Sequence, residues 1–204
     1  MLFDHTYRTI KAPCEGIFRD KGSKFIAYGF PIKTEESVKS HLSNLREEHP
    51  KASHYCWALR LTPDRTVYRT NDDGEPSGTA GRPILNILLS MDVTNILIVV
   101  VRYFGGTLLG VPGLINAYKT ATQEVLKAAS IVELTINDHY QMHFQYPQIN
   151  AVMQIIKDHQ LTILNQKLEN ECQLEVEIPK STLNTIVFKL EKIPGLSLSY
   201  LRTL

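Results

Sequence analysis

Residues 95–106 read NILIVVVRYFGG, an almost unbroken run of aliphatic residues that stops at two glycines. Apolar residues at every position are typical of a strand whose two faces are both covered by other layers. From Pro112 onward the apolar residues follow helical spacing, with Leu114, Ala121 and Val125 on one face. The run therefore predicts the central strand of an α/β domain, followed by a helix over residues 112–129.

The residues before this run carry further strand and helix signals. We expect strands at 7–12, 16–19 and 24–31, with a turn at Asp20-Lys21-Gly22 joining the last two. Acidic residues at 35–36 open an amphipathic helix that ends before Pro50. A second hairpin is predicted from strands at 53–62 and 66–70, followed by a short helix over 83–91. These elements complete the first domain.

After Val132 the pattern of strands and helices starts again. The predicted order is strand 139–146, helix 148–159, strands 162–168 and 173–178, helix 181–192 and strand 196–201. This β-α-β-β-α-β order is that of a ferredoxin-like domain. We therefore expect an α+β protein of two domains, residues 1–132 and 133–204, with the polar segment 133–138 as the linker.

The composition narrows the class of protein. A length of 204 residues with 43% hydrophobic and 21% charged residues suits an ordered protein of two domains. No apolar run is long enough to span a membrane and the first residues have no signal-peptide core, so we expect a cytoplasmic protein. Three cysteines without a C-x-x-C pair indicate neither a zinc site nor a disulfide framework.

The charge is distributed unevenly between the two halves. Residues 1–132 hold 16 Lys and Arg against 13 Asp and Glu, whereas residues 133–204 hold 6 against 8. If one half contacts phosphate groups, we expect it to be the first. Seven of the eleven glycines lie from Gly74 to Gly113, which directs attention to two loops within that half.

The first loop, residues 70–81, reads TNDDGEPSGTAG and leads into a helix. Backbone N–H groups of Gly, Ser and Thr before a helix start can bind an anion. The carboxylates of Asp72, Asp73 and Glu75 could instead hold a hard cation such as Mg²⁺, but they equally serve ordinary turns and helix caps. These interpretations stay open from the sequence.

The second loop, residues 102–113, reads RYFGGTLLGVPG and is the best candidate surface, because ligands gather where a strand ends and a helix starts. The glycines match neither the P-loop nor the dinucleotide-binding pattern, so no cofactor is predicted. Arg102 beside Tyr103 and Phe104 places a cation next to rings that could stack on nucleic-acid bases. The alternative is that Tyr103 and Phe104 are core residues and that Arg102 pairs with a loop carboxylate. At least one of Gly105 and Gly106 should have a positive φ or a very close backbone neighbour.

Four segments together resemble the signature of the IMPACT family, also called YigZ-like: KGSKF (21–25), SHYCWALRL (53–61), NDDGEPSGTAGRPIL (71–85) and ILIVVVRYFGGTLLGVPGLINAY (96–118). The resemblance implies that the first domain shares the fold of a small-subunit ribosomal protein domain, of GHMP kinases and of domain IV of elongation factor G. It implies that the second resembles domain V of that factor. It also implies a link to translation, because eukaryotic members modulate a translation-control kinase by competing for its activator.

The resemblance and the two loops select the candidate binding residues Lys21, Lys24, His54, Asp73, Gly74, Glu75, Ser77, Gly78, Thr79, Arg102, Tyr103, Phe104, Gly105, Gly106 and Gly110. We expect a translation-associated binding protein whose partner is RNA or a ribosome-associated protein, with Lys21, Lys24 and Arg102 forming a basic surface. The alternative is a phosphate-handling enzyme, with Mg²⁺ on Asp73 or Glu75 and phosphate on the backbone of Gly105 and Gly106. That alternative ranks second because its glycine loop has no lysine and no catalytic base is identified; no metal site is predicted.

Overall fold

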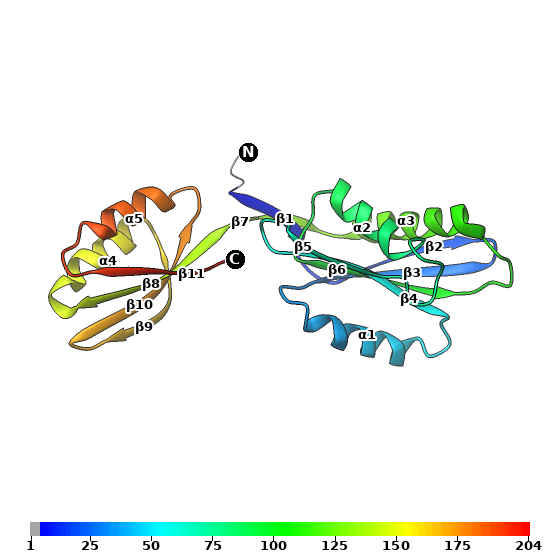
Figure 1. Cartoon of the computed structure of the whole chain (residues 1–204), viewed down its shortest axis with the longest axis horizontal. Helices are drawn as coiled ribbons and strands as arrows, with labels where there is room; N and C mark the ends of the chain where they lie inside the picture. Colours follow the sequence, from blue (N-terminus) through cyan, green and yellow to red (C-terminus); the bar gives the residue numbers. More distant parts are fainter. Residues whose placement is uncertain (1–4) are drawn as a thin grey trace. The chain divides into compact units, whose positions relative to one another are not determined.

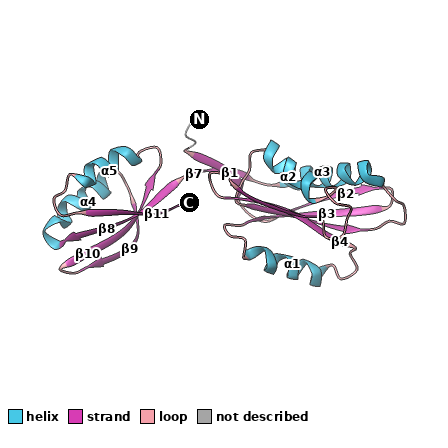
Figure 2. Ribbon diagram, viewed as in Figure 1, coloured by secondary structure: helices cyan, strands magenta, loops and turns pink. Residues whose placement is uncertain are grey.

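The computed structural model describes residues 5–204 (Figure 1). The described chain divides into two compact units. One unit is Tyr7–Leu134, and the other is Thr135–Leu204 together with His5 and Thr6. Each unit combines helices with β-sheet, in agreement with the α+β class expected from the sequence (Figure 2).

A five-stranded sheet forms the centre of the Tyr7–Leu134 unit. Its strands lie in the order β2 (Cys14–Asp20), β3 (Ser23–Pro31), β6 (Ile96–Tyr103), β4 (His54–Leu61) and β5 (Val67–Asn71), and all neighbours are antiparallel. The run that predicted a central strand is β6, and its side chains from Ile96 to Arg102 are buried. That prediction is confirmed.

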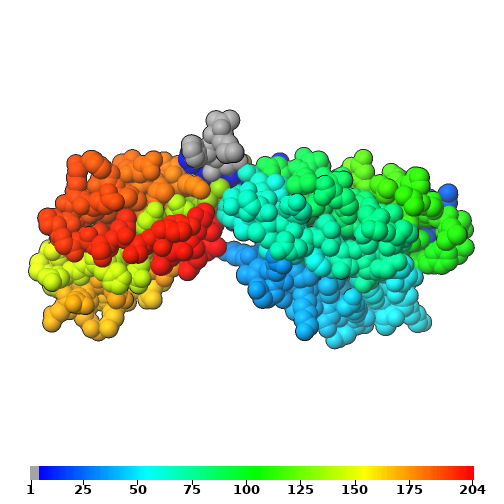
Figure 3. Space-filling view, viewed as in Figure 1, coloured from blue at the N-terminus to red at the C-terminus, as the bar shows by residue number. Residues whose placement is uncertain are grey.

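Helices cover both faces of this sheet, as Figure 1 shows. The helix α1 (Ser37–Glu48) packs on one face, and α2 (Gly81–Ser90) and α3 (Gly110–Ala128) pack on the other. In the space-filling view α1 forms the blue side of this unit and the α2–α3 region the green side (Figure 3). Because strand residues alternate between faces, Val100 belongs to the core under α2 and α3, whereas Val99 belongs to the core under α1. The apolar run of β6 thus reflects two covered faces of an antiparallel sheet.

A small two-stranded sheet joins the ends of this unit. Its strands are β1 (Thr6–Ile10) and β7 (Ile131–Thr135). The sequence predicted a polar linker at 133–138, but β7 occupies its first half and β8 (Asn137–Gln145) begins soon after. The strand was missed because its five residues are partly or fully exposed and carry no clear alternation. The division at residue 132 remains a prediction.

The other unit has the element order expected from the sequence. It comprises β8, a single 3₁₀ turn (Tyr146–Gln148), α4 (Ile149–Asp158), β9 (Thr162–Leu168), β10 (Glu171–Pro179), α5 (Leu183–Glu191) and β11 (Ser197–Thr203). The strands lie in the order β11-β8-β10-β9 and are antiparallel throughout. Buried Met142 and Val176 of the sheet share a core with Val152 of α4 and Ile186 of α5. Within residues 5–204, no helix has the length and apolar character needed to cross a membrane.

Candidate functional site

The candidate site is built around Arg102 near the end of β6. In the strand register Arg102 lies opposite Phe25 of β3 on one side and opposite His54 of β4 on the other. Side chains at paired positions share a face, so all three lie on the face that α2 and α3 cover. The guanidinium carbon of Arg102 lies 5.4 Å from the ring centroid of Phe25 and 5.6 Å from that of Phe104. The arginine is therefore held between two aromatic rings.

The first loop supplies the partner of this arginine. Arg102 Nη1 lies 2.5 Å from Glu75 Oε1, and the Tyr118 hydroxyl of α3 donates to the same oxygen over 2.7 Å. Only 6% of the Arg102 side chain and 3% of the Glu75 side chain are exposed, so neither charge is solvated by water. A buried pair of this kind persists because each charge compensates the other, and the Tyr118 hydroxyl adds a hydrogen bond to the carboxylate. The alternative interpretation is therefore confirmed for Arg102, which pairs with a loop carboxylate, but it is wrong for Phe104, which is 49% exposed and not a core residue.

Two further groups complete the polar cluster beneath the loop. His54 Nε2 lies 3.9 Å from Glu75 Oε1, and Cys56 Sγ lies 3.2 Å from the Tyr118 hydroxyl oxygen. Burial is the main reason that the pKa of the Cys56 thiol and the pKa of the Tyr118 phenol are raised above their ordinary values. Since a cysteine nucleophile must be a thiolate, Cys56 is not activated for nucleophilic chemistry in this environment.

The remaining carboxylates of the first loop contact protein donors: Asp72 binds the loop's own backbone, and Asp73 binds groups of β4 and α1. Asp72 accepts hydrogen bonds from the N–H groups of Gly78, Ala80 and Gly81, at 2.8, 3.1 and 2.8 Å. Asp73 Oδ2 accepts from the Tyr55 N–H over 2.6 Å, and its other oxygen lies 3.5 Å from Arg46. These contacts favour turn and capping chemistry over Mg²⁺ binding, because each oxygen that could bind a cation already faces protein donors.

The geometry also limits how a metal could bind. Across residues 5–204, no three His, Cys, Asp or Glu side chains are grouped so that they could hold a metal ion. An Mg²⁺ ion on Asp73 or Glu75 would therefore depend on water or phosphate for most of its ligands.

The two glycines after β6 meet both of the conditions expected of them. A Cβ atom on Gly105 would overlap the backbone of Gly22 and Ser23, and Gly106 has a φ of +84°. The Gly105 N–H also donates to Ser23 Oγ over 3.2 Å. The prediction of a close backbone approach or a positive φ is confirmed, and the contact fastens the second loop to the β2–β3 turn that carries Lys21.

The predicted basic set does not come together as one surface. Lys24 lies opposite Tyr103 in the β3–β6 register, one position away from the Phe25 and Arg102 pair. Because the pleat alternates, Lys24 lies on the α1 side of the sheet and Arg102 on the α2–α3 side. Lys21 is exposed in the turn, whereas Arg102 is buried in its ion pair.

A cavity of about 480 Å³ lies where the two loops meet, and we call it the signature pocket. Its lining is Ser53, His54, Glu75, Pro76, Arg102, Phe104, Leu108, Leu109, Gly110, Val111 and Leu114. Three apolar side chains of this lining are largely open to solvent: Leu108 is 83% exposed, Val111 52% and Phe104 49%. A pocket with apolar walls and a few convergent polar groups is the usual form of a binding site.

The signature pocket gathers some of the sequence-predicted residues and excludes others. It includes His54, Glu75, Arg102, Phe104 and Gly110. Three other candidates have roles in their own loops or strands: Gly74 has a φ of +86°, Thr79 Oγ1 donates to the Pro76 carbonyl, and the Tyr103 hydroxyl is hydrogen-bonded to His49. The candidates that do not line the signature pocket also include Lys21, Lys24, Asp73, Ser77, Gly78, Gly105 and Gly106. The sequence prediction missed the other lining residues, which are Ser53, Pro76, Leu108, Leu109, Val111 and Leu114. Apolar residues in a glycine-rich loop, such as exposed Leu108, are themselves a signal of a binding surface.

Comparison with known proteins defines the class. Residues 21–126 match the family model described as the Impact N-terminal domain, so the first unit is a domain of this class. An IMPACT family member of Haemophilus influenzae is 35% identical over 181 residues, which cover 86% of this chain and 86% of the relative. The chain belongs to the IMPACT family.

Solved structures add two comparisons. A crystal structure of a protein described as hypothetical matches 98% of this chain and 99% of its own, with a TM-score of 0.76 and 29% identity. A structure described as that of the two-domain translational regulator Yih1 aligns with 63% of this chain and 49% of its own, with 30% identity and a TM-score of 0.36. The first of these likenesses extends over both units of the chain.

Proposed function

We propose that this chain is a translation-associated regulatory protein that binds a ribosome-associated protein through the signature pocket. The observation that carries the proposal is the exposure of Leu108, Phe104 and Val111 around a buried polar base. Exposed apolar side chains that cluster beside a cavity, and that the fold itself does not bury, are typical of protein interaction sites. The close backbone contact of Gly105 with the β2–β3 turn positions this loop beside the pocket.

The charges of the pocket favour a protein over nucleic acid at this position. Arg102 is the cation among the lining residues, and its charge is cancelled by Glu75 at 2.5 Å. Affinity for a phosphate backbone comes from cations that replace counterions, and a paired, buried arginine supplies little of that attraction. This lining suits a partner protein better than a nucleic acid. An apolar side chain of the partner would contact the exposed apolar residues, and polar groups beside it would form hydrogen bonds with the base of the pocket.

The family supports the link to translation. The sequence predicted a link to translation because the chain resembles the IMPACT family. Yih1, a relative at 30% identity, is described as a translational regulator. We extend that role to this chain and expect it to act in the cytoplasm, where ribosomes are available. The expected likeness of the two units to domains IV and V of elongation factor G remains a prediction, and it agrees with a ribosomal setting.

The phosphate-handling enzyme stays the second candidate. Its metal ligands would be Asp73 or Glu75, but Asp73 accepts from Tyr55 and Glu75 is paired with Arg102. A carboxylate that already has protein donors would have to give them up before it could bind Mg²⁺. We therefore place binding ahead of catalysis.

Co-sedimentation with ribosomes isolated at low salt tests the proposal. Leu108→Asp puts a charge on the most exposed apolar residue of the pocket, where little stability depends on it. Leu164→Asp is the matched control, because Leu164 is a 41% exposed leucine of β9 in the other unit. We expect the wild type and the control to sediment with ribosomes and Leu108→Asp to remain in solution. Equal sedimentation of all three proteins would refute the proposal.

A further inference from the structure

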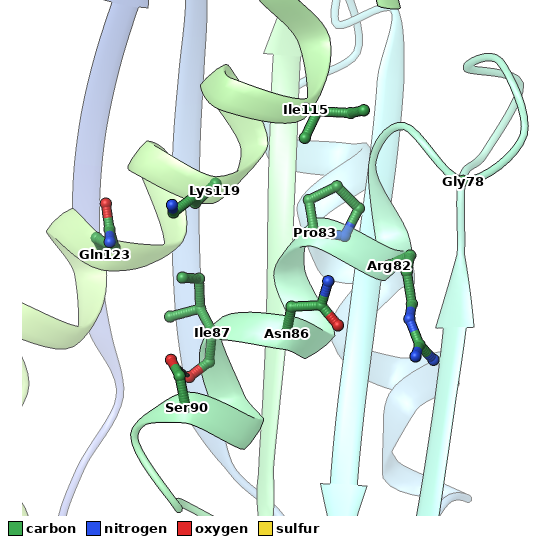
Figure 4. Close-up of a pocket in the computed structure, with 9 residues that line it drawn as sticks. All are labelled: Gly78, Arg82, Pro83, Asn86, Ile87, Ser90, Ile115, Lys119 and Gln123. Carbon is green, nitrogen blue, oxygen red and sulfur yellow. Dashed lines mark hydrogen bonds between the residues drawn. The ribbon is translucent and has the colours of Figure 1, made fainter. Parts of the chain in front are cut away.

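A second cavity lies between α2 and α3, and its residues take no part in the proposed protein contact. We call it the helix groove; its volume is about 560 Å³. Two rows of residues spaced four apart line it: Arg82, Asn86 and Ser90 on α2, and Ile115, Lys119 and Gln123 on α3 (Figure 4). Residues four apart share one side of a helix, so each row runs along about 12 Å of its helix axis.

The charged groups of the helix groove all have the same sign. Arg82 contributes a guanidinium from α2 and Lys119 an ammonium from α3, both exposed, and no carboxylate lines the groove. Within residues 5–204, neither cation forms an ion pair. Some other cations of this unit do have a carboxylate partner, as Arg60 pairs with Asp92 at 3.1 Å. The groove therefore selects a ligand that carries negative charge on more than one group.

The uncharged groups narrow the ligand further. The amides of Asn86 and Gln123 add donors and acceptors beside the cations, which suits the edges of nucleic-acid bases. Pro83 and Ile87 lie between the two rows, and Ile115 is 39% exposed at one end of the groove (Figure 4). This apolar floor offers a surface on which the face of a base or a ribose can pack, whereas a free phosphate ion would leave it unused.

We infer that the helix groove binds single-stranded RNA, with phosphate groups at Arg82 and Lys119 and a base over the apolar floor. Single-stranded sites combine a cationic track with surfaces on which unpaired bases pack, usually aromatic rings. The helix groove has two cations, and the aliphatic side chains of its floor take the place of the rings. In a duplex the bases are stacked and paired, so only its phosphate groups could contact the groove, through Arg82 and Lys119. The site is separate from the signature pocket and from the basic set expected from the sequence, since Lys21, Lys24 and Arg102 do not line the helix groove.

Fluorescence anisotropy with a short labelled single-stranded RNA, measured over a salt series, tests the inference. We expect Arg82→Ala with Lys119→Ala to weaken binding on the order of ten-fold at low salt. The slope of log affinity against log salt should fall by about 1.4, or about 0.7 for each lost phosphate contact. Lys24→Ala is the matched control, because it removes a cation from the other side of the sheet, and it should leave both quantities unchanged.

Three further measurements make the result decisive. The double variant Arg82→Lys with Lys119→Arg keeps both charges, so its affinity for RNA should stay within about two-fold of the wild type. If the substitutions acted by disturbing the fold, this variant would bind as weakly as the double alanine variant. Leu108→Asp should bind RNA normally, so failure of the pocket proposal and failure of this inference give different results. The inference is overturned if the wild type does not bind RNA, if the alanine pair binds as well as the wild type, or if uridine monophosphate competes as strongly as the oligonucleotide.

Discussion

Gly22 and Gly105 lie backbone against backbone, so closely that a Cβ atom on Gly105 would overlap the carbonyl group of Gly22. Gly22 itself has a φ of +81°, which a residue with a side chain adopts only with strain. This contact connects the β2–β3 turn to the loop after β6. It thereby fixes the position of Phe104, which precedes Gly105 and lines the signature pocket.

Gly105 and Gly106, which are adjacent in the sequence, should respond differently to substitution. Gly105→Ala should lower the free energy of unfolding by about 1 to 3 kcal/mol, because the new atom has no room. Gly106→Asn should cost little, since Gly106 needs only a positive φ, which asparagine tolerates, and has open space around it. Gly106→Val should cost about 1 to 3 kcal/mol, because a β-branched side chain does not tolerate the positive φ. Urea denaturation measures all three, and equal losses for Gly105→Ala and Gly106→Asn would contradict the assignment.

The ion pair of Arg102 with Glu75 predicts a large cost for removing one partner. Glu75→Gln leaves a buried guanidinium without its counter-charge, and we expect a loss of about 3 to 5 kcal/mol. Tyr118→Phe removes one hydrogen bond to the same carboxylate and should cost about 1 to 3 kcal/mol. The double variant Glu75→Gln with Arg102→Met should lose less than the sum of its single changes. Additive losses in denaturation would show that the two residues do not act as a pair.

Buried thiol and phenol groups predict a loss of stability at alkaline pH. Burial raises the pKa of the Cys56 thiol above its usual 9.0, so the thiol ionises in the unfolded chain while it stays protonated in the folded one. Its contribution to stability is complete below about pH 9 and declines as the pH rises toward the folded pKa, by about 1.4 kcal/mol per pH unit. The pKa of the Tyr118 phenol is raised in the same direction, mainly by burial, and adds to the decline above about pH 10.

The alkaline decline can be assigned to Cys56 by one variant. Cys56→Ala has no thiol to ionise, so its free energy of unfolding should fall less steeply between about pH 9 and pH 10 than that of the wild type. Denaturation at a series of pH values provides the comparison. If the free energy of unfolding fell equally steeply with pH in both proteins, groups other than Cys56 would cause the decline.

Local periodicity was enough to predict most elements of the fold. The apolar run of β6, the helical spacing of α3 and the β-α-β-β-α-β order all depend on neighbouring residues, and the structure confirms them. The short strand β7 was missed because it is half exposed and makes its pairing with β1, far away in the sequence.

The candidate site was harder to predict because it depends on contacts between distant segments. In β6 apolar residues occupy both faces, so no alternation shows on which face Arg102 lies. Its pairing with Glu75 follows from the path of a loop, and the placement of Arg82 and Lys119 along one groove follows from the packing of α2 beside α3. The sequence located the two loops correctly but could not show which side chains they bring together.

The division into two units predicts that the first folds without the second. A fragment of residues 1–135 should unfold in one cooperative thermal transition, because it keeps the five-stranded sheet, its three helices α1 to α3 and the β1–β7 pair. A fragment that ends at residue 132 removes most of β7 and should melt at a lower temperature. A fragment of residues 1–135 that shows no cooperative transition would mean that the units depend on each other for folding.

Photo-crosslinking from the signature pocket tests the central claim most directly. The photoreactive residue p-benzoylphenylalanine is placed at position 108 of the full chain, or at position 164 as the control, and each protein is irradiated with ribosomes isolated at low salt. We expect position 108 to crosslink to one ribosome-associated protein, identified by mass spectrometry, with the product lost when unlabelled wild type competes. The absence of a crosslink from position 108, or the same product from position 164, would contradict the proposal that this pocket binds the partner.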